Sequence, residues 1–465
     1  MKKGAIVMST SALKTTMKRV NGDSITPIII FNRLRGVHKF FWEGAQHIDQ
    51  KERYTYIGVN PVKSYTGIDE TVIEYDYYTN ESFVYKGELF EILKKIIPQQ
   101  TNETEFEFAG GLLGFMSYNA MVPQCKANEC EINLPHMQFS LYDTVIIYDH
   151  FKEEVILIHS DLTGIDAHEQ FAKLEKQIFT PIDEEPHAYE LSSFYSEMSD
   201  VQYGDLVRQA QRFIEEGEVK QLVLSRQFIA DFAGNAFSLY RELRKSTKAP
   251  NMYFLEYDGY YMIGASPKEF LRIDDDNITV TPVTGARPRG SNAREDVQME
   301  LTLLQNAKEI NSHNLLVDMT MKDLSDICVP SAVVLSEYMK PMQFMHSIRL
   351  ATEINGKLHP ETHPVDALRK LAPPAASSGV PKERASEIIK EIETVPRAFY
   401  GGVIGQFSLN KKVNFSLLQQ TMVIKNQKAY TQAGANILAD TIDIDAIVET
   451  RKKIEAFLLL DSNKV

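Results

Sequence analysis

The sequence predicts a large α+β protein in which antiparallel strands dominate both halves of the chain. Between residues 25 and 160, runs rich in β-branched and aromatic residues alternate with polar or Gly-containing turns. Residues 252–267 form two further strand-like runs around Asp258-Gly259, a pair typical of a hairpin turn. Apolar residues at helical spacing recur as well, for example over 203–214, so helices are expected beside the strands.

The first half should contain mostly strands. The segments expected to form them are 25–31, 38–43, 53–59, 71–78, 110–119 and 142–150, with one helix over 88–97. Residues 160–200 are polar and acidic, which predicts a surface connection.

The second half should begin near Ser199. The helix over 203–214 should stop at Gly217, and a strand should follow over 219–225. After the hairpin we expect a helix over 295–313, a strand over 412–424 and a last helix that contains 448–453.

The bulk composition limits the partners of the 465-residue chain. The formal net charge is −13 and there is no basic run, which argues against nucleic acid or an anionic membrane as a partner. No stretch reaches the roughly 18 apolar residues needed to cross a membrane, and the first residues form no signal peptide. The three cysteines form no zinc pattern and no even-numbered disulfide framework. A reducing, cytoplasmic location is the simplest expectation.

The chain is organised around residues 372–402. A loop of small residues from Pro373 to Gly379 leads into a helix, with Pro381 expected in its first turn. Pro396 should end this helix, and a strand should start at Tyr400. A loop of small residues before a helix start leaves N–H groups free, which suits an anion.

This stretch resembles the signature of the chorismate-utilising enzymes, P-A-G-T-L-S-G-A-P-K-x-R-A followed by R-G-x-Y-G-G. Ala375 and Ala376 replace its Gly-Thr. The segments 41–44, 52–58 and 142–150 are similar to those of anthranilate synthase large subunits. The matching signature residues are Pro373, Ser378, Gly379, Pro381, Lys382, Arg384, Ala385, Arg397, Tyr400, Gly401 and Gly402.

The resemblance implies one composite α+β fold. In such proteins two large antiparallel sheets pack face to face as a two-layer sandwich, with helices outside and the active site in a cleft between the sheets. It also implies an N-terminal region over 25–165 and a chorismate-binding catalytic region over 199–460, both forming one interlaced fold.

The choice of nucleophile depends on Gln221. Relatives that add water to chorismate carry a lysine base there, whereas relatives that use ammonia carry a neutral residue. Water needs a base to become a nucleophile, but ammonia already has a lone pair, so Gln221 favours ammonia. Thr284 stands where aminodeoxychorismate synthases often carry a nucleophilic lysine, and its identity favours anthranilate synthesis.

The catalytic acid is the largest departure from the family pattern. Lys268 occupies the position of the glutamate that protonates the leaving hydroxyl, and Glu269 follows one residue later. Neighbouring strand residues face opposite ways, so Glu269 can replace that glutamate only if the backbone bulges. The motif F-M-H-S-I places His346 at the active-site histidine of the family.

The resemblance also implies a substrate site and a Mg²⁺ site. Gln420 replaces the family arginine that binds a chorismate carboxylate, Asn436 replaces a glycine, and Ser312 replaces a metal-binding carboxylate. Glu309 and Glu449 keep the carboxylates expected to hold Mg²⁺, an ion that takes few ligands from protein. The expected substrate-binding residues are Thr284, Gly285, Ala376, Tyr400, Gln420, Gly434 and Lys382.

These resemblances imply the large subunit of an anthranilate synthase, acting on chorismate in tryptophan biosynthesis. The chain has no glutaminase motif of the G-x-C-x-G kind, so a separate glutamine amidotransferase subunit would supply ammonia. Two alternatives stay open: aminodeoxychorismate synthase component I, and a paralogue that has lost catalysis and serves in binding or regulation.

Overall fold

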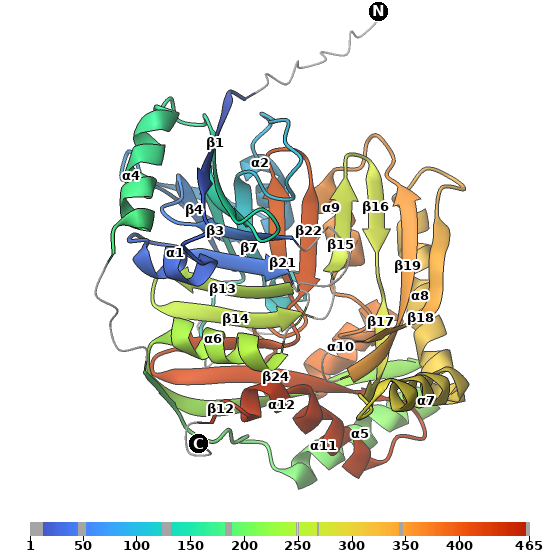
Figure 1. The fold of residues 1–465 in the computed structure, drawn as a ribbon. Helices are drawn as coiled ribbons and strands as arrows, with labels where there is room; N and C mark the ends of the chain where they lie inside the picture. The colour runs from blue at the N-terminus through green and yellow to red at the C-terminus, as the bar shows by residue number, and fades with distance from the viewer. Residues whose placement is uncertain are drawn as a thin grey trace, which may run out of the picture.

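Two antiparallel sheets carry the fold of the chain (Figure 1). The computed structural model describes residues 13–44, 53–122, 132–181, 188–247, 249, 251–266, 269–343 and 347–461. Among these residues the helices are α1 (Pro27–Arg33), α2 (Leu89–Ile96), α3 (Tyr118–Met121), α4 (Ala167–Phe179), α5 (Asp200–Glu215), α6 (Ala236–Thr247), α7 (Ala293–Gln305), α8 (Ala307–Ser325), α9 (Pro364–Leu371), α10 (Lys382–Ile392), α11 (Asp443–Lys453) and α12 (Glu455–Leu458).

The first sheet continues from N-terminal strands into C-terminal ones, because β2 pairs with β13. Its order is β1 (Thr15–Asn21), β10 (Glu154–Ser160), β9 (Thr144–Asp149), β3 (Tyr54–Gly58), β2 (Phe40–Gly44), β13 (Asn251–Tyr257), β14 (Tyr260–Ser266), β23 (Thr421–Lys425), β24 (Lys428–Ile437), β12 (Gln221–Gly234) and β11 (Tyr189–Leu191), with β20 (Gly379–Val380) paired to β12.

The second sheet is joined in the same way, because β21 pairs with β7. Its order is β17 (Val283–Pro288), β19 (Ser347–Lys357), β16 (Asn277–Val280), β15 (Glu269–Asp274), β22 (Val413–Leu417), β21 (Val403–Ser408), β7 (Gly111–Met116), β8 (Met137–Tyr142), β4 (Lys63–Ile68), β5 (Thr71–Asp76) and β6 (Glu81–Lys86), with β18 (Val334–Gln343) paired to β19.

An aromatic core fills the space between the sheets. Phe40 and Leu255 of the first sheet join the same buried cluster as Leu113, Phe115 and Ile404 of the second. Alternate residues of each strand face opposite sides, so the outer faces of the sheets need other cover. The predicted α+β class with two antiparallel sheets is confirmed.

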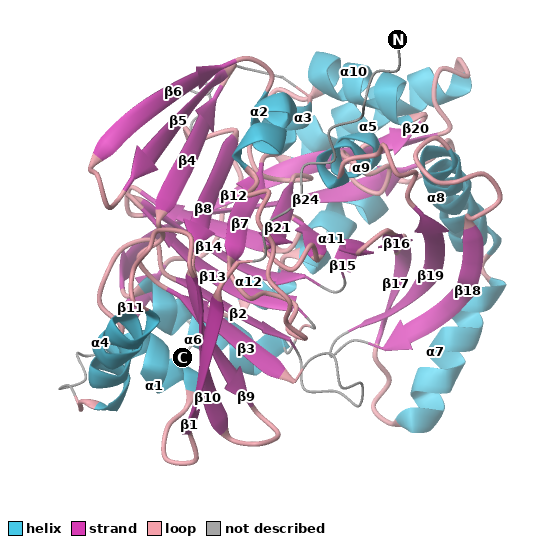
Figure 2. Ribbon diagram, turned by 90° about the horizontal axis from the view of Figure 1, so that it is seen from above, coloured by secondary structure: helices cyan, strands magenta, loops and turns pink. Residues whose placement is uncertain are grey.

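Helices provide that cover. The helices α1, α4, α6 and α12 pack on the first sheet, and α2, α8 and α9 pack on the second. A further cluster joins α5, α10 and α11 to β12 and β24, while α7 packs against β17 and β19 (Figure 2). Within the described part of the chain, no helix has the length and apolar character that a membrane crossing requires.

Several predicted elements are confirmed. Helix α2 covers the segment expected over 88–97, and α5 ends just before Gly217, which has a positive φ of 80°. The hairpin of β13 and β14 turns at Asp258-Gly259, as its sequence predicts.

Other predictions about elements are wrong. Residues 27–33 form helix α1 and no strand, because Pro27 takes the first helical position and the Thr26 hydroxyl accepts from the Ile29 N–H at 3.3 Å. The surface connection predicted over 160–200 also contains helix α4 and strand β11, which the prediction did not include. The helix expected over 295–313 breaks at Asn306, whose side chain caps α8 through the Glu309 N–H.

Two boundaries near the candidate site also differ from the prediction. The strand expected over 412–424 divides into β22 and β23, so Gln420 lies in their connection. Pro381 precedes the first residue of α10 and is its N-cap, and the strand expected from Tyr400 starts at Val403.

Candidate active site

The start of β12 meets α8 and the end of β24 through three polar side chains. Asn436 donates through Nδ2 to Ser312 Oγ at 3.0 Å, and the Ser312 hydroxyl donates to Gln221 Oε1 at 2.9 Å. Gln221 and Ser312 are 2% and 4% exposed. The structure therefore joins Gln221 to Ser312 directly and to Asn436 through Ser312, and both partners depart from the family pattern.

A buried ion pair holds the signature loop, residues 373–379, against strand β12. Arg397 donates to both carboxylate oxygens of Glu393, at 2.8 and 2.7 Å, and to the carbonyls of Val223 and Ser377. Arg397 is fully buried, and Glu393 also accepts from the Ser225 N–H at 2.7 Å. The loop before α10 is thus fixed to β12 by a charge with no exposure to water.

An inner cavity of about 60 Å³ lies beside this loop. Ala375 and Ala376 line it from the loop, and Arg349 of β19 lines it from the second sheet. Small side chains in the loop leave this space open. Its wall is otherwise largely apolar, with Phe270, Val280, Pro282, Val283, Leu316, Met319, Leu371, Pro374 and Leu417 among its members.

Glu269 also lines the inner cavity. Its Oε1 accepts from Asn414 Nδ2 at 2.5 Å, and the pairing of β15 with β22 shifts register between Glu269 and Leu271. The strand pairing is therefore irregular directly after this carboxylate, and the predicted replacement of Lys268 by Glu269 stays a prediction. Lys268 lies outside the described residues.

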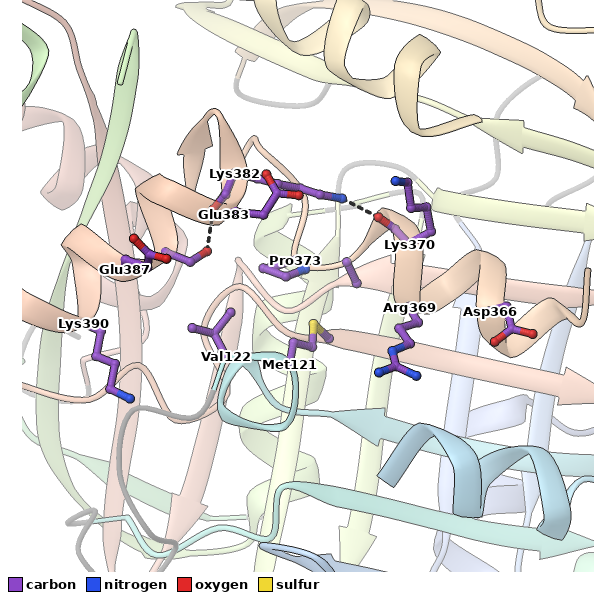
Figure 3. A pocket seen from close by; sticks show the side chains of 12 residues that line it. Met121, Val122, Asp366, Arg369, Lys370, Pro373, Lys382, Glu383, Glu387 and Lys390 are labelled. Atoms are coloured by element: carbon purple, nitrogen blue, oxygen red, sulfur yellow. Dashed lines mark hydrogen bonds between the residues drawn. The ribbon is translucent and has the colours of Figure 1, made fainter. Parts of the chain in front are cut away.

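Lys382 points to the other side of the loop. Its ammonium donates to the Lys370 carbonyl of α9 (Figure 3). It also donates to Asp323 Oδ2 of α8 at 2.7 Å, so Lys382 ties α10 to both helices. The side chain lines an outer groove of about 610 Å³. In this structure Lys382 does not join the residues that line the inner cavity, although its partner Asp323 does.

Tyr400 and Gly434 form a second cluster. A Cβ on Gly434 would lie 2.6 Å from the Tyr400 hydroxyl, so only glycine allows this approach. Lys453 donates to the Gly434 carbonyl at 2.6 Å and to Glu449 at 2.7 Å. Burial alone would lower the pKa of Lys453, but Glu449 and Tyr400 together outweigh burial and the pKa is raised.

Arg349 faces the same carboxylate from β19. Burial lowers the pKa of its guanidinium, and the charge of Glu449 opposes that effect. Ile348 and Leu350, its neighbours on the strand, are fully buried on the opposite face. Arg349 therefore brings a positive charge into a largely apolar wall.

Glu309 lies in the first turn of α8. Its Oε1 accepts from Arg287 at 3.0 Å. Gly285 has a φ of +64°, and a Cβ there would lie 3.1 Å from Glu309 Oε2. Gly285, expected to bind substrate, thus lies beside Glu309, expected to bind Mg²⁺, and the glycine leaves room for the carboxylate.

Thr284 binds a protein group through its hydroxyl. Its Oγ1 lies 2.5 Å from His313 Nδ1, and His313 Nε2 lies 2.6 Å from Thr352 Oγ1. Burial lowers the pKa of His313 to about 4, so the ring is neutral at physiological pH.

Two further predicted site residues, Gln420 and His346, have no side-chain hydrogen bond that the structure describes. Gln420 offers its backbone carbonyl to the Ala265 N–H at 3.0 Å. Its side chain makes no hydrogen bond with a described residue. His346 lies outside the described residues.

Sequence reasoning missed Arg349 and Lys453. A single arginine in the otherwise uncharged run S-I-R-L-A-T is a signal that could have identified Arg349. Lys453 follows Glu449 by four residues, the spacing at which helical side chains meet, and this spacing could have identified the pair.

Comparisons with known proteins give the family to which the chain is similar. The family model described as chorismate binding enzyme matches residues 38–459. Anthranilate synthase component 1 of Lactococcus lactis is 30% identical over 457 residues, which cover 95% of this chain and 98% of the relative. The protein of the same name from Acetivibrio thermocellus is 30% identical over 466 residues, covering 94% and 93%.

Solved structures give the same result for the fold. Anthranilate synthase component I of Streptococcus pneumoniae superposes with a TM-score of 0.78 at 27% identity, over 94% of this chain and 99% of that one. The menaquinone-specific isochorismate synthase MenF of Escherichia coli superposes with a TM-score of 0.73 at 15% identity, over 97% and 95%. At that identity the second likeness concerns the fold alone.

Proposed function

Because the chain belongs to the chorismate-binding enzyme family, we propose that it is the large subunit of an anthranilate synthase, which converts chorismate and ammonia to anthranilate and pyruvate. The names of its relatives support this choice. The observation that carries it is the neutral surroundings of Gln221.

Gln221 has a hydroxyl as its side-chain partner. Among the described residues, no acidic or basic side chain hydrogen-bonds to it. Water must lose a proton before it can attack carbon efficiently, whereas ammonia attacks with its lone pair. This part of the site therefore suits ammonia, and addition of water should be slow.

We assign the anchoring of chorismate to two cations that interact with the Glu449 carboxylate. Chorismate carries two carboxylates, and an arginine or lysine binds a carboxylate through charge-assisted hydrogen bonds. Arg349 in the cavity wall and Lys453 beside Gly434 supply such charges, while Gln420 supplies none. Tyr400 places a hydroxyl at Gly434, next to Lys453.

Glu269 is our candidate for the proton donor to the leaving hydroxyl group. Glu269 lines the cavity, and its carboxylate accepts a hydrogen bond from Asn414 that can orient it. A general acid must lie within hydrogen-bond reach of the group that it protonates.

The carboxylate oxygens of Glu309 and Glu449 are ligands of the kind that Mg²⁺ binds. Both carboxylates are partly exposed, and each has an oxygen beyond the one that holds Arg287 or Lys453. Partly exposed ion pairs are weak, so they can exchange for a metal. Mg²⁺ bound there would neutralise negative charge on the substrate. The Ser312 hydroxyl already donates to Gln221, so it is not part of this set.

We further propose that a glutamine amidotransferase subunit supplies ammonia to this chain in the cytosol. The sequence has no glutaminase nucleophile motif, and the relatives are named as component 1 of a synthase.

Product analysis tests the proposal. The protein is incubated with chorismate, Mg²⁺ and ammonium, and products are separated by chromatography with fluorescence detection of anthranilate. Anthranilate as the main product supports the proposal. A 4-amino-4-deoxychorismate product would identify aminodeoxychorismate synthase component I, isochorismate would refute the role given to Gln221, and no product would favour the non-catalytic paralogue.

A further inference from the structure

The hydrogen-bonded chain of Asn436, Ser312 and Gln221 has a defined direction. A serine hydroxyl has one proton to donate. Because Asn436 Nδ2 donates to Ser312 Oγ at 3.0 Å, the Ser312 proton is directed to Gln221 Oε1 at 2.9 Å. The side-chain carbonyl of Gln221 is therefore turned toward α8.

The amide N–H group of Gln221 is left at the end of this chain. It makes no hydrogen bond with a described residue, and it is not among the buried unpaired polar atoms of the described residues. Asn436 Oδ1, at the other end, is buried without a partner. An amide N–H with no acceptor among the described residues can donate to an oxygen atom of a bound anion.

The surrounding backbone fixes where this amide lies. Gln221 pairs with Val380 of β20, and a Cβ on Gly379 would lie 2.3 Å from the Gln221 carbonyl oxygen. Lys220 N donates to the Val380 carbonyl at 2.7 Å. The signature loop and the start of β12 thus hold the backbone of Gln221, while Ser312 sets its side chain.

We propose that Ser312 and Asn436 are positioning residues that orient the Gln221 amide so that its N–H group donates to an oxygen of bound chorismate. The inference rests on the proposed substrate and goes beyond the proposed reaction, because it concerns binding. It makes Ser312 and Asn436 parts of one working unit, although each alone resembles a loss from the family pattern. The unit contains no ionisable group, so its hydrogen bonds persist across the physiological pH range.

Calorimetric titration with chorismate in the presence of Mg²⁺ tests the inference on the full chain. Ser312→Ala should weaken chorismate binding about 10-fold, the usual effect of losing a hydrogen bond near 1.4 kcal/mol. Ser312→Thr, which keeps the hydroxyl, should stay within about threefold of wild type. Ser325→Ala is the matched control, because Ser325 lies on the same helix and, among the described residues, its exposed hydroxyl binds only the Met321 carbonyl, at 2.7 Å.

A second comparison separates positioning from a structural effect. Gln221→Glu keeps an oxygen for the Ser312 proton but replaces the N–H group with an acceptor, so it should weaken binding of the dianion at least 10-fold. In a Gln221→Ala background, Ser312→Ala should cause no further loss. Urea unfolding midpoints establish that each variant is folded.

Several results would overturn the inference. One is an unchanged chorismate affinity in folded Ser312→Ala. Another is that Ser312→Ala lowers the chorismate affinity as much in the Gln221→Ala background as in the wild type. The third is that the wild type does not bind chorismate. The readout is binding, so absence of anthranilate formation would refute the proposed reaction and leave this measurement intact.

Discussion

His313 should make the fold lose stability as the pH falls below neutrality. The ring is buried between Thr284 and Thr352, and burial lowers its pKa from 6.5 to about 4. Between these two pH values the unfolded chain binds a proton that the folded chain does not, so stability falls as the pH falls. Each pKa unit corresponds to about 1.4 kcal/mol. The loss between pH 7 and pH 5 should be about 2 kcal/mol, approaching about 3 kcal/mol below pH 4.

Urea denaturation of wild type and His313→Gln at pH 7, 6 and 5 measures this effect. Glutamine can still hydrogen-bond to a threonine hydroxyl but does not titrate, so the variant should lose less stability on acidification. His168→Gln, on the exposed face of α4, is the control and should follow the wild type. If the curves for wild type and His313→Gln stay parallel from pH 7 to pH 5, the buried-histidine argument is wrong.

Three further predictions concern the charged groups of the site. Arg397→Met should destabilise the fold by about 3–5 kcal/mol, because it leaves the Glu393 carboxylate buried without its partner. Adding Glu393→Gln should recover part of this loss. Equal urea midpoints for wild type and Arg397→Met would contradict the prediction. Arg349→Gln should raise the KM for chorismate about 10- to 100-fold if the guanidinium holds a carboxylate, and steady-state kinetics with an unchanged KM would exclude that role. A Glu309→Gln, Glu449→Gln double variant should lose Mg²⁺ binding measured by calorimetry with chorismate present, and unchanged affinity would remove both residues from the metal site.

Local sequence patterns predicted the helices and strands well where the spacing of apolar residues was clear. The hairpin at Asp258-Gly259 and helix α5 follow from turn chemistry and from apolar spacing. The segment 25–31 was misassigned because its β-branched residues favour strand, whereas Thr26 and Pro27 together start a helix. Asn306 was read as a helix interior residue, yet its side chain can cap a new helix.

The candidate site was less accessible to prediction, because its contacts join residues far apart in the chain. Motif positions identified Gln221, Ser312 and Asn436 one by one, but only the structure shows that they form one hydrogen-bonded chain. Lys382 belongs to the signature, yet Asp323 and the Lys370 carbonyl take its ammonium. Arg349 matched no motif, and its position follows from strand pairing.

The pairing of β7 with β21 has a consequence for how the protein is made. Ser408, at the end of β21, lies 298 residues beyond Gly110, whose carbonyl accepts its hydroxyl at 3.3 Å. At about 5–20 residues per second, a ribosome needs roughly 15–60 s to synthesise that interval. During this time β7 has an open edge on the side where β21 will pair, and open strand edges invite association with other chains. The nascent N-terminal half should therefore depend on chaperones, and slower synthesis at low temperature should not by itself improve the yield of folded protein.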